Sequence, residues 1–338
     1  MATRRWTNGN STGVANDALN WDDGAGSPGA IPVSGDDVQF TSYNTDDCDW
    51  NINPIGLGSF TITSGYTGVI TVNNNDYISS AGAVTIAAGK TIKFKNGASL
   101  IAYTLDISGA SGSRTTLQSN TVNDYWTLKE YSSNSQTWDI DYCDIEGCDV
   151  IFNCSIDRTA TFDNCNFEIY RYFRVYNYEH TITLTNCVLD NFASGTLWYF
   201  DYNKPEAIIK FVNTSCKNFQ PSIHYRTTGS GNYMERLHLQ DGIQIFNDRS
   251  SSQIVTNMIA GSATPRKVYR GGNKRYEMGI IPINYTPDGT LRAIAERGDT
   301  VAISTYREFI SKCLITTPLI RYNYADEREI RWTVEETL

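Results

Sequence analysis

The sequence lacks several features that would assign it to a common class of protein. It has no apolar run of about 18 residues, the length that a membrane-spanning helix needs, so we expect no membrane partner. No apolar segment follows the first residues, so we expect no secretory signal peptide and synthesis in a cytoplasm. No P-loop is present, and a nucleotide-binding site is therefore not predicted.

Metal-binding and triad patterns are also missing. The chain has 8 cysteines but no CxxC pair, and none of its 3 histidines lies near them at metal-ligand spacing. We therefore predict no metal site and interpret the cysteines as reduced thiols in an apolar core. No histidine has a serine or cysteine partner at a recognisable spacing, so a catalytic triad is not predicted either.

Charge is scarce and mostly negative. Charged residues make up 19% of the 338 residues, and the formal net charge is -9. This balance argues against a nucleic-acid partner, because a duplex-binding protein needs a basic face. The chain is long enough for two domains. Gly, Ser, Thr, Asn and Asp are abundant, and 21 tyrosines are present, which favours strands and turns over helices.

The most informative pattern is a repeat. Cys143, Cys165 and Cys187 follow one another at intervals of 22 residues within short alternating segments, and Cys216 follows 29 residues later. Weaker copies with the pattern apolar, polar, apolar begin at residues 60, 84 and 105. A repeat of this length is typical of one turn of a β-helix, which buries its inward residues only by stacking on its neighbours. We predict an all-β chain with a right-handed parallel β-helix over residues 56–233, in which the four cysteines form an internal ladder.

The two ends differ from the repeat. Residues 1–55 contain Trp6, Asn20-Trp21, Ile31-Pro32 and Gly35-Asp36-Asp37, and this spacing resembles the entry segment of β-helical surface and phage proteins. The resemblance to parallel β-helix proteins of the phage virion or tailspike type implies an N-terminal cap there. Residues 234–338 are richer in charge, and we predict a β-rich attachment or interaction domain with one short helix at 291–297.

An aromatic segment is the strongest candidate for a binding surface. In the segment 170–178, Phe173 and Val175 are predicted to point inward, which leaves the alternate residues outside. Exposed Tyr, Trp and Arg side chains are typical of protein interfaces, and aromatic rings also stack on sugars. Protein contact, glycan contact and packing under loops all remain open. The predicted binding surface comprises Tyr170, Tyr172, Arg174, Tyr176, Tyr178, Trp198 and Tyr199.

A group of carboxylates is a weaker candidate. Alternation places Asp139 and Asp141 on the outer face of one strand, with Asp144 close by. Paired carboxylates can hydrolyse a glycan or bind Ca²⁺, although a solvated acidic face explains them equally well. We take them as weak catalytic candidates, with Ca²⁺ as a weak possibility for a cofactor.

These features favour a non-enzymatic structural protein of a bacteriophage virion, such as a capsid decoration, baseplate or fibre component. Phage proteins assemble in the cytoplasm and need no signal peptide. The expected partners are other virion proteins and copies of the same chain in a homo-oligomer, with cell-surface glycan as an open alternative. Two other functions remain: a tailspike-like polysaccharide depolymerase and a glycan-binding adhesin.

Overall fold

The computed structural model describes residues 2–131, 137–153, 158–176, 180–192, 199–202, 208–218, 222–226, 234–238, 245–248, 268–270, 273–280, 295–296, 300–304, 309–315, 319–322 and 328–336. The chain divides into two compact units. Unit 1 comprises Met1–Trp198 and Lys210–Asn218, and unit 2 comprises Tyr199–Ile209 and Phe219–Leu338.

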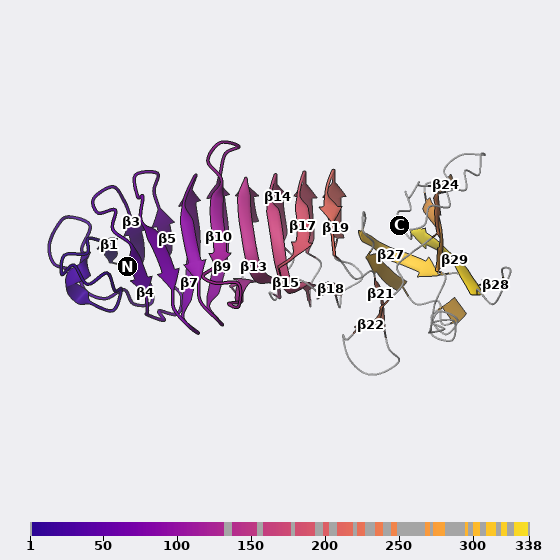
Figure 1. Ribbon diagram of the computed structural model, residues 1–338, viewed down its shortest axis with the longest axis horizontal. Coiled ribbons are helices and arrows are strands. Elements are labelled where there is room, and N and C mark those ends of the chain that lie inside the picture. The colour runs from indigo at the N-terminus through magenta and orange to yellow at the C-terminus, as the bar shows by residue number, and fades with distance from the viewer. Residues whose placement is uncertain are drawn as a thin grey trace. The chain divides into compact units, whose positions relative to one another are not determined.

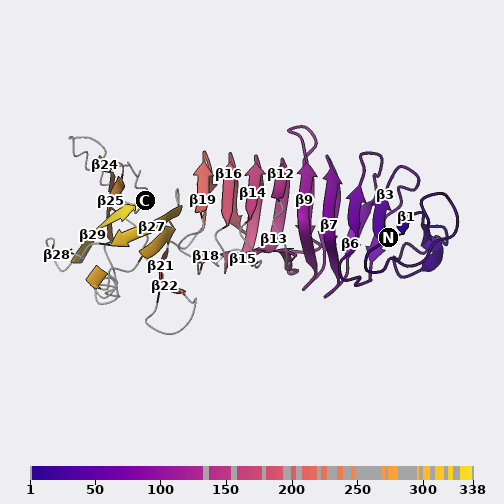
Figure 2. The same ribbon diagram turned by 180° about the vertical axis from the view of Figure 1, so that it is seen from behind.

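Unit 1 is a parallel β-solenoid of about six turns, so the predicted parallel β-helix is confirmed. Its right-handed sense stays a prediction. Figures 1 and 2 show its strands lying side by side along the stack. Residues 60, 84 and 105, which the repeat places together, lie opposite one another in successive turns. Each full turn contributes to three strand ladders, which we call the first, second and third faces.

The strands of the three faces are as follows. The first face comprises β1 (Thr3–Trp6), β3 (Asp37–Phe40), β5 (Ser59–Ile62), the second halves of β7 (Tyr77–Ala87) and β9 (Ser99–Ser108), β12 (Thr137–Asp141), β14 (Thr159–Asp163), β16 (Thr181–Thr185) and β19 (Ile208–Val212). The second face comprises β4 (Cys48–Trp50), β6 (Val69–Val72), β8 (Thr91–Phe94), β10 (Thr115–Ser119), the first halves of β13 (Cys143–Phe152) and β15 (Asn166–Val175), β17 (Val188–Asn191) and β20 (Ser215–Cys216). The third face comprises the first halves of β7 and β9, β11 (Trp126–Glu130), and the second halves of β13 and β15.

Alternation along each strand builds the core. In β16, Ile182 and Leu184 are buried, whereas the three threonines of the strand are only partly covered. The β-branched residues suit this pleated, half-buried position. At the N-terminal end the core is aromatic: Trp21 packs against Trp6 and Trp50 with ring centroids 5.2 and 6.3 Å apart. Large buried rings of this kind supply much apolar area in a narrow interior.

The parallel ladder extends into the segment 1–55. Strands β3 and β4 pair with β5 and β6. Beyond β4, the Asp49 N–H donates to the Gly13 carbonyl at 2.7 Å, and Ala15 N–H donates to the Asp49 carbonyl at 2.9 Å. These bonds occupy backbone groups that an open end would leave unpaired. Strand β2 (Trp21–Asp22), preceded by the 3₁₀ turn η1 (Ala18–Asn20), pairs antiparallel with β1. The role of this segment as a cap and the boundaries at 55/56 and 233/234 stay predictions.

An asparagine ladder marks the turn between the first and second faces. Asn164, Asn186 and Asn213 have φ angles of 56, 54 and 50°. The Asn186 side-chain amide donates to Asn164 Oδ1, and that of Asn213 donates to Asn186 Oδ1, both at 3.3 Å. Asparagine tolerates the left-handed conformation better than other residues with a Cβ atom, which explains its recurrence here.

The predicted cysteine ladder is correct for three of its four members. Cys143, Cys165 and Cys187 are buried and directly precede residues that pair across β13, β15 and β17. Cys216, however, pairs with Leu189, two positions further along, so its assignment to this ladder is wrong. The turn residue Asn213 sets the register, and Thr214 rather than Cys216 follows it. All six described cysteine side chains are buried free thiols, the other two being those of Cys48 and Cys148.

A buried ion pair lies where the third face of unit 1 passes into the first. The Arg158 guanidinium lies 3.6 Å from the Glu130 carboxylate, and each side chain is 1% exposed. Its Nη1 and Nη2 also donate to the backbone carbonyls of Tyr103 and Tyr131, at 2.8 and 3.0 Å. Because a buried charge is costly without partners, these contacts fix the chain at this position.

Unit 2 contains a mostly antiparallel sheet, so the β-rich character predicted for the C-terminal region is confirmed. Its path runs β22-β21-β26-β27-β29-β25-β23, with β24 beside β25 and β28 beside β29. Of the predicted helix 291–297, the structure describes only Ala295 and Glu296, both helical, so the helix itself stays a prediction. The strands are β21 (Ser222–Arg226), β22 (Met234–His238), β23 (Ile245–Asp248), β24 (Val268–Arg270), β25 (Asn273–Ile280), β26 (Thr300–Ser304), β27 (Phe309–Ile315), β28 (Leu319–Tyr322) and β29 (Arg328–Glu336). Strand β18 (Tyr199–Tyr202) also falls in unit 2.

Candidate functional site

The aromatic candidates lie on the outside of β15 and just beyond its end. Phe173 and Val175 are fully buried, as the alternation predicts. Tyr170, Tyr172, Arg174 and Tyr176 are each partly exposed. Tyr178 and Trp198 lie outside the described residues. Tyr199 begins β18, but its side chain is not among those described.

A β-bulge shapes this part of the surface. Cys148 of β13 pairs with Ile169, whereas Val150 pairs with Phe173, so Asp149 alone faces the three residues 170–172. The Asp149 carboxylate accepts hydrogen bonds from the backbone N–H groups of Arg171 and Tyr172, at 2.9 and 3.3 Å. It therefore satisfies donors that the bulge removes from the strand ladder.

The same carboxylate anchors the Arg171 side chain. Arg171 Nε and Nη2 both donate to Asp149 Oδ2, at 2.9 and 2.6 Å. The Asp149 side chain is completely buried, yet that of Arg171 is 49% exposed. Burial opposes the charged form of Arg171, but its hydrogen bond with Asp149 and that carboxylate's charge raise its pKa. The guanidinium is thus a fixed cation at the surface.

Tyrosine rings surround this guanidinium. Its central carbon lies 5.3, 5.3 and 5.2 Å from the ring centroids of Tyr125, Tyr170 and Tyr172. Tyr125 and Tyr170 stack on each other, with centroids 4.9 Å apart and planes 9° apart. Arg174 lies over the rings of Tyr172 and Tyr176, at 4.0 and 4.8 Å. We call this set the Tyr–Arg surface; it comprises Tyr125, Tyr170, Arg171, Tyr172, Arg174 and Tyr176.

Sequence reasoning missed two members of this surface. Alternation placed Arg171 between outward residues and hence inside, but the bulge breaks the alternation and turns it outward. Tyr125 lies 45 residues before Tyr170. It directly precedes Trp126, which pairs with Cys148, and Cys148 pairs with Ile169. Two repeats of 22 residues lead from Tyr125 to Ile169, so the period alone would have placed Tyr125 one residue from Tyr170.

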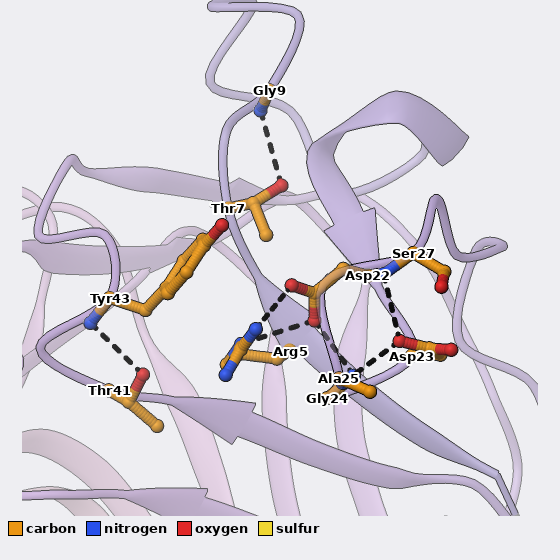
Figure 3. Close-up of polar contacts among 10 residues, drawn as sticks. All are labelled: Arg5, Thr7, Gly9, Asp22, Asp23, Gly24, Ala25, Ser27, Thr41 and Tyr43. Carbon is orange, nitrogen blue, oxygen red and sulfur yellow. Dashed lines mark hydrogen bonds and ion pairs between the residues drawn. The ribbon is translucent and has the colours of Figure 1, made fainter.

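An arginine near the N-terminus offers a structural comparison. Arg5 Nε and Nη2 donate to the two carboxylate oxygens of Asp22, at 3.1 and 2.6 Å, and Tyr43 covers the guanidinium at 4.0 Å (Figure 3). Here the arginine side chain is only 18% exposed. The contact therefore ties β1 to β2 and leaves little of the cation available for a ligand, in contrast to Arg171.

The loop that follows Asp22 contains a pattern that the sequence analysis overlooked. Residues 24–29 match GxGxxG, a glycine pattern associated with dinucleotide binding. That chemistry requires a helix directly after the glycines, and residues 23–36 contain none. Instead, Asp23 accepts hydrogen bonds from the N–H groups of Ala25 and Ser27, as Figure 3 shows. A carboxylate thus occupies the backbone donors that would bind a phosphate.

The carboxylate candidates separate onto two faces. Asp139 and Asp141 lie on the outside of β12, with Ile140 buried between them, as predicted. Asp139 accepts from the Thr161 hydroxyl at 2.6 Å. Burial raises the pKa of Asp141, and so do the charges of Asp139, Asp163 and Asp106.

Asp144 does not join that pair. It lies on the second face, where Arg114 Nε and the Asn166 amide each donate to its Oδ1 at 2.8 Å. Beside it, Glu146, Glu168 and Asp190 occupy equivalent positions in three successive turns. Burial and the charges of neighbouring carboxylates raise the pKa of both Glu146 and Glu168. Like charges opposite each other in a ladder repel.

Two further findings concern the described residues only. They contain no group of three or more His, Cys, Asp or Glu side chains arranged to hold a metal ion. They also contain no helix with the length and apolar character needed to cross a membrane.

The chain has no recognised relatives among the proteins with which it was compared. It matches no protein-family model, and neither curated proteins nor solved structures show a significant similarity to it. Its function must therefore be inferred from the geometry of its own residues.

Proposed function

We propose that this chain is a non-enzymatic structural protein of a bacteriophage virion, and that its Tyr–Arg surface contacts another virion protein. The observation that carries the proposal is this surface, in which four tyrosines and two arginines, all at least partly exposed, gather on β15 and beside the ends of β11 and β15. Tyrosine and arginine are enriched at protein interfaces and are frequent hot spots. Capsid decoration, baseplate and fibre are the positions considered.

The scaffold supports this role. Strands of successive turns hydrogen-bond along three faces, so a residue pattern on the outside is held in fixed register. The bulge over Asp149 adds a buried ionic anchor directly under the tyrosines. A contact surface on such a base loses little conformational entropy when it binds. The virion location itself rests on the resemblance of residues 6–37 to phage β-helix entry segments.

The test is electron cryomicroscopy of the particle fraction from the source culture. We expect the chain in symmetric copies on a capsid or tail, with the Tyr–Arg surface against a neighbouring protein. Incorporation should fall for Tyr170→Ala with Tyr172→Ala, and should stay unchanged for Thr183→Ala on the first face. Particles that lack the chain would disprove the virion assignment.

A second candidate is a polysaccharide hydrolase centred on Asp139 and Asp141. The raised pKa of Asp141 beside the carboxylate of Asp139 is the observation that favours it. In that case the purified chain should shorten a polysaccharide, and Asp141→Asn should abolish the cleavage. Asp144→Asn is the control, because Asp144 lies on the other face and bonds to Arg114.

A further inference from the structure

We propose that Arg171 is a carboxylate-binding site and that the Tyr–Arg surface receives an acidic segment of a protein partner through it. The inference builds on the proposed function, because it uses the same surface and names the chemistry of the partner. It also assigns the central contact to a residue that alternation placed in the core.

The Arg171 guanidinium has further hydrogen-bond donors besides those that Asp149 uses. Asp149 takes its Nε and one hydrogen of Nη2. Across the described ranges of the chain, its Nη1 makes no hydrogen bond, and neither do the hydroxyl groups of Tyr125 and Tyr170. A guanidinium on the surface with two tyrosine rings within 5.3 Å of it suits an oxyanion, because charge-assisted hydrogen bonds are the strongest kind.

The site is built before any ligand arrives. The buried Asp149 carboxylate fixes the orientation of the guanidinium from below, and the stacked pair of Tyr125 and Tyr170 lies beside it. Arg5 has a comparable aspartate and tyrosine but is largely covered, so the same contacts there serve the fold. The exposure of Arg171 separates a recognition residue from a structural one.

Charge and ring geometry favour an acidic polypeptide over an acidic glycan. The described part of the surface carries two arginines and one aspartate, an excess of one positive charge within a chain of net charge -9. A glycan would stack its sugars on open aromatic faces. Here one face each of Tyr125 and Tyr170 is used by their mutual stack, and Arg174 covers Tyr172 and Tyr176.

The experiment measures binding of fluorescently labelled poly-L-glutamate to the full chain at low ionic strength, by fluorescence anisotropy. The chain as a whole repels this anionic probe, so binding requires a local site. Arg171→Gln should weaken the affinity by about tenfold to a hundredfold, as expected for hydrogen bonds to a charged group. Arg171→Lys should lie between, because it keeps the charge but loses the planar fork.

The matched control is Arg114→Gln. Arg114 also pairs with an aspartate, Asp144, whose side chain is 24% exposed, but no described tyrosine ring lies over it. Equal losses for Arg114→Gln and Arg171→Gln would show general electrostatics and overturn the proposal. So would a wild-type chain that leaves poly-L-glutamate unbound.

Two further measurements distinguish an acidic protein segment from a glycan and from a second copy of the chain. Tighter, Arg171-dependent binding of polygalacturonate than of poly-L-glutamate would overturn the proposal in favour of a glycan. Arg171-dependent self-association in sedimentation velocity, without binding of poly-L-glutamate, would overturn it in favour of a second copy. If particles lack the chain yet the probe binds through Arg171, the virion assignment fails and the carboxylate site stands.

A second set of variants guards against misfolding. Arg171→Gln alone leaves the buried Asp149 charge without its guanidinium, whereas Asp149→Asn with Arg171→Gln replaces the ion pair by two amides. Tyr125→Phe with Tyr170→Phe removes only hydroxyl groups and should weaken binding by about threefold to tenfold. Unchanged affinity in both folded double variants would overturn the proposal.

Discussion

Replacing Asn186 by alanine should open the solenoid locally more than replacing it by glycine. Asn186 has a φ of 54°, donates to Asn164 and accepts from Asn213, and its side chain is exposed. Either substitution removes both side-chain hydrogen bonds. Because these are long, at 3.3 Å, and exposed, each contributes about 0.5 kcal/mol, so their loss costs about 1 kcal/mol.

The two variants differ in the free-energy cost of a positive φ at residue 186. Glycine adopts a positive φ freely, whereas alanine pays about 1 kcal/mol or more in the left-handed region. We therefore expect local destabilisation of about 1 kcal/mol for Asn186→Gly and about 2 kcal/mol for Asn186→Ala. Amide hydrogen exchange over residues 181–192 measures this opening directly. The protection should fall about fivefold and thirtyfold, respectively.

Asn166 supplies the internal control. It begins β15, lies in extended backbone and gives its amide to Asp144 at 2.8 Å. There the order should invert, with glycine worse than alanine, because glycine weakens a strand. If alanine and glycine had equal effects at Asn186, or the same order at both sites, the positive φ would not be the constraint that selects asparagine.

Three further perturbations test the packing and electrostatics of unit 1. A Cβ atom at Gly82 would lie 1.9 Å from the Gly58 carbonyl oxygen, whereas one at Gly112 would meet nothing within 4 Å. Gly82→Ala should therefore lower the unfolding free energy by about 3 kcal/mol or more, and Gly112→Ala should be neutral in the same denaturation assay. Arg158→Met should cost about 3–5 kcal/mol, because it leaves the buried Glu130 carboxylate without the guanidinium, and a thermal unfolding shift worth less than about 1 kcal/mol would contradict this. Glu168→Gln should raise the unfolding midpoint at pH 7, because burial and the charges of Asp190 and Asp144 raise the pKa of Glu168 in the folded chain. A carboxyl group whose pKa is raised in the folded chain destabilises that chain as the pH rises from the group's ordinary pKa through the raised one. The wild type and the variant should therefore have the same unfolding midpoint below about pH 4.

The repeat made the solenoid predictable, but it did not predict the strand register where the spacing departs from 22 residues. Equivalent residues such as Phe162 and Leu184 follow the period and fall in register. The spacing between Cys187 and Cys216 is longer, and alignment on cysteine gave the wrong register. Alignment on Asn186 and Asn213 would have been correct, because a positive φ at the turn is a stricter requirement than a thiol in the core.

The Tyr–Arg surface shows why local alternation could not complete the site. From Glu146 to Glu168 the spacing between paired residues is 22, but Cys148 pairs with Ile169 at 21 and Val150 with Phe173 at 23. The two added residues form the bulge. Asp149 stabilises it, because its carboxylate accepts hydrogen bonds from the backbone N–H groups of Arg171 and Tyr172 and from the Arg171 side chain. A strict period would have buried Tyr172 opposite Val150, whereas strict alternation buries Arg171. Neither rule takes account of the buried Asp149 carboxylate that stabilises the bulge. The outward position of Arg171 could therefore be found only from the structure.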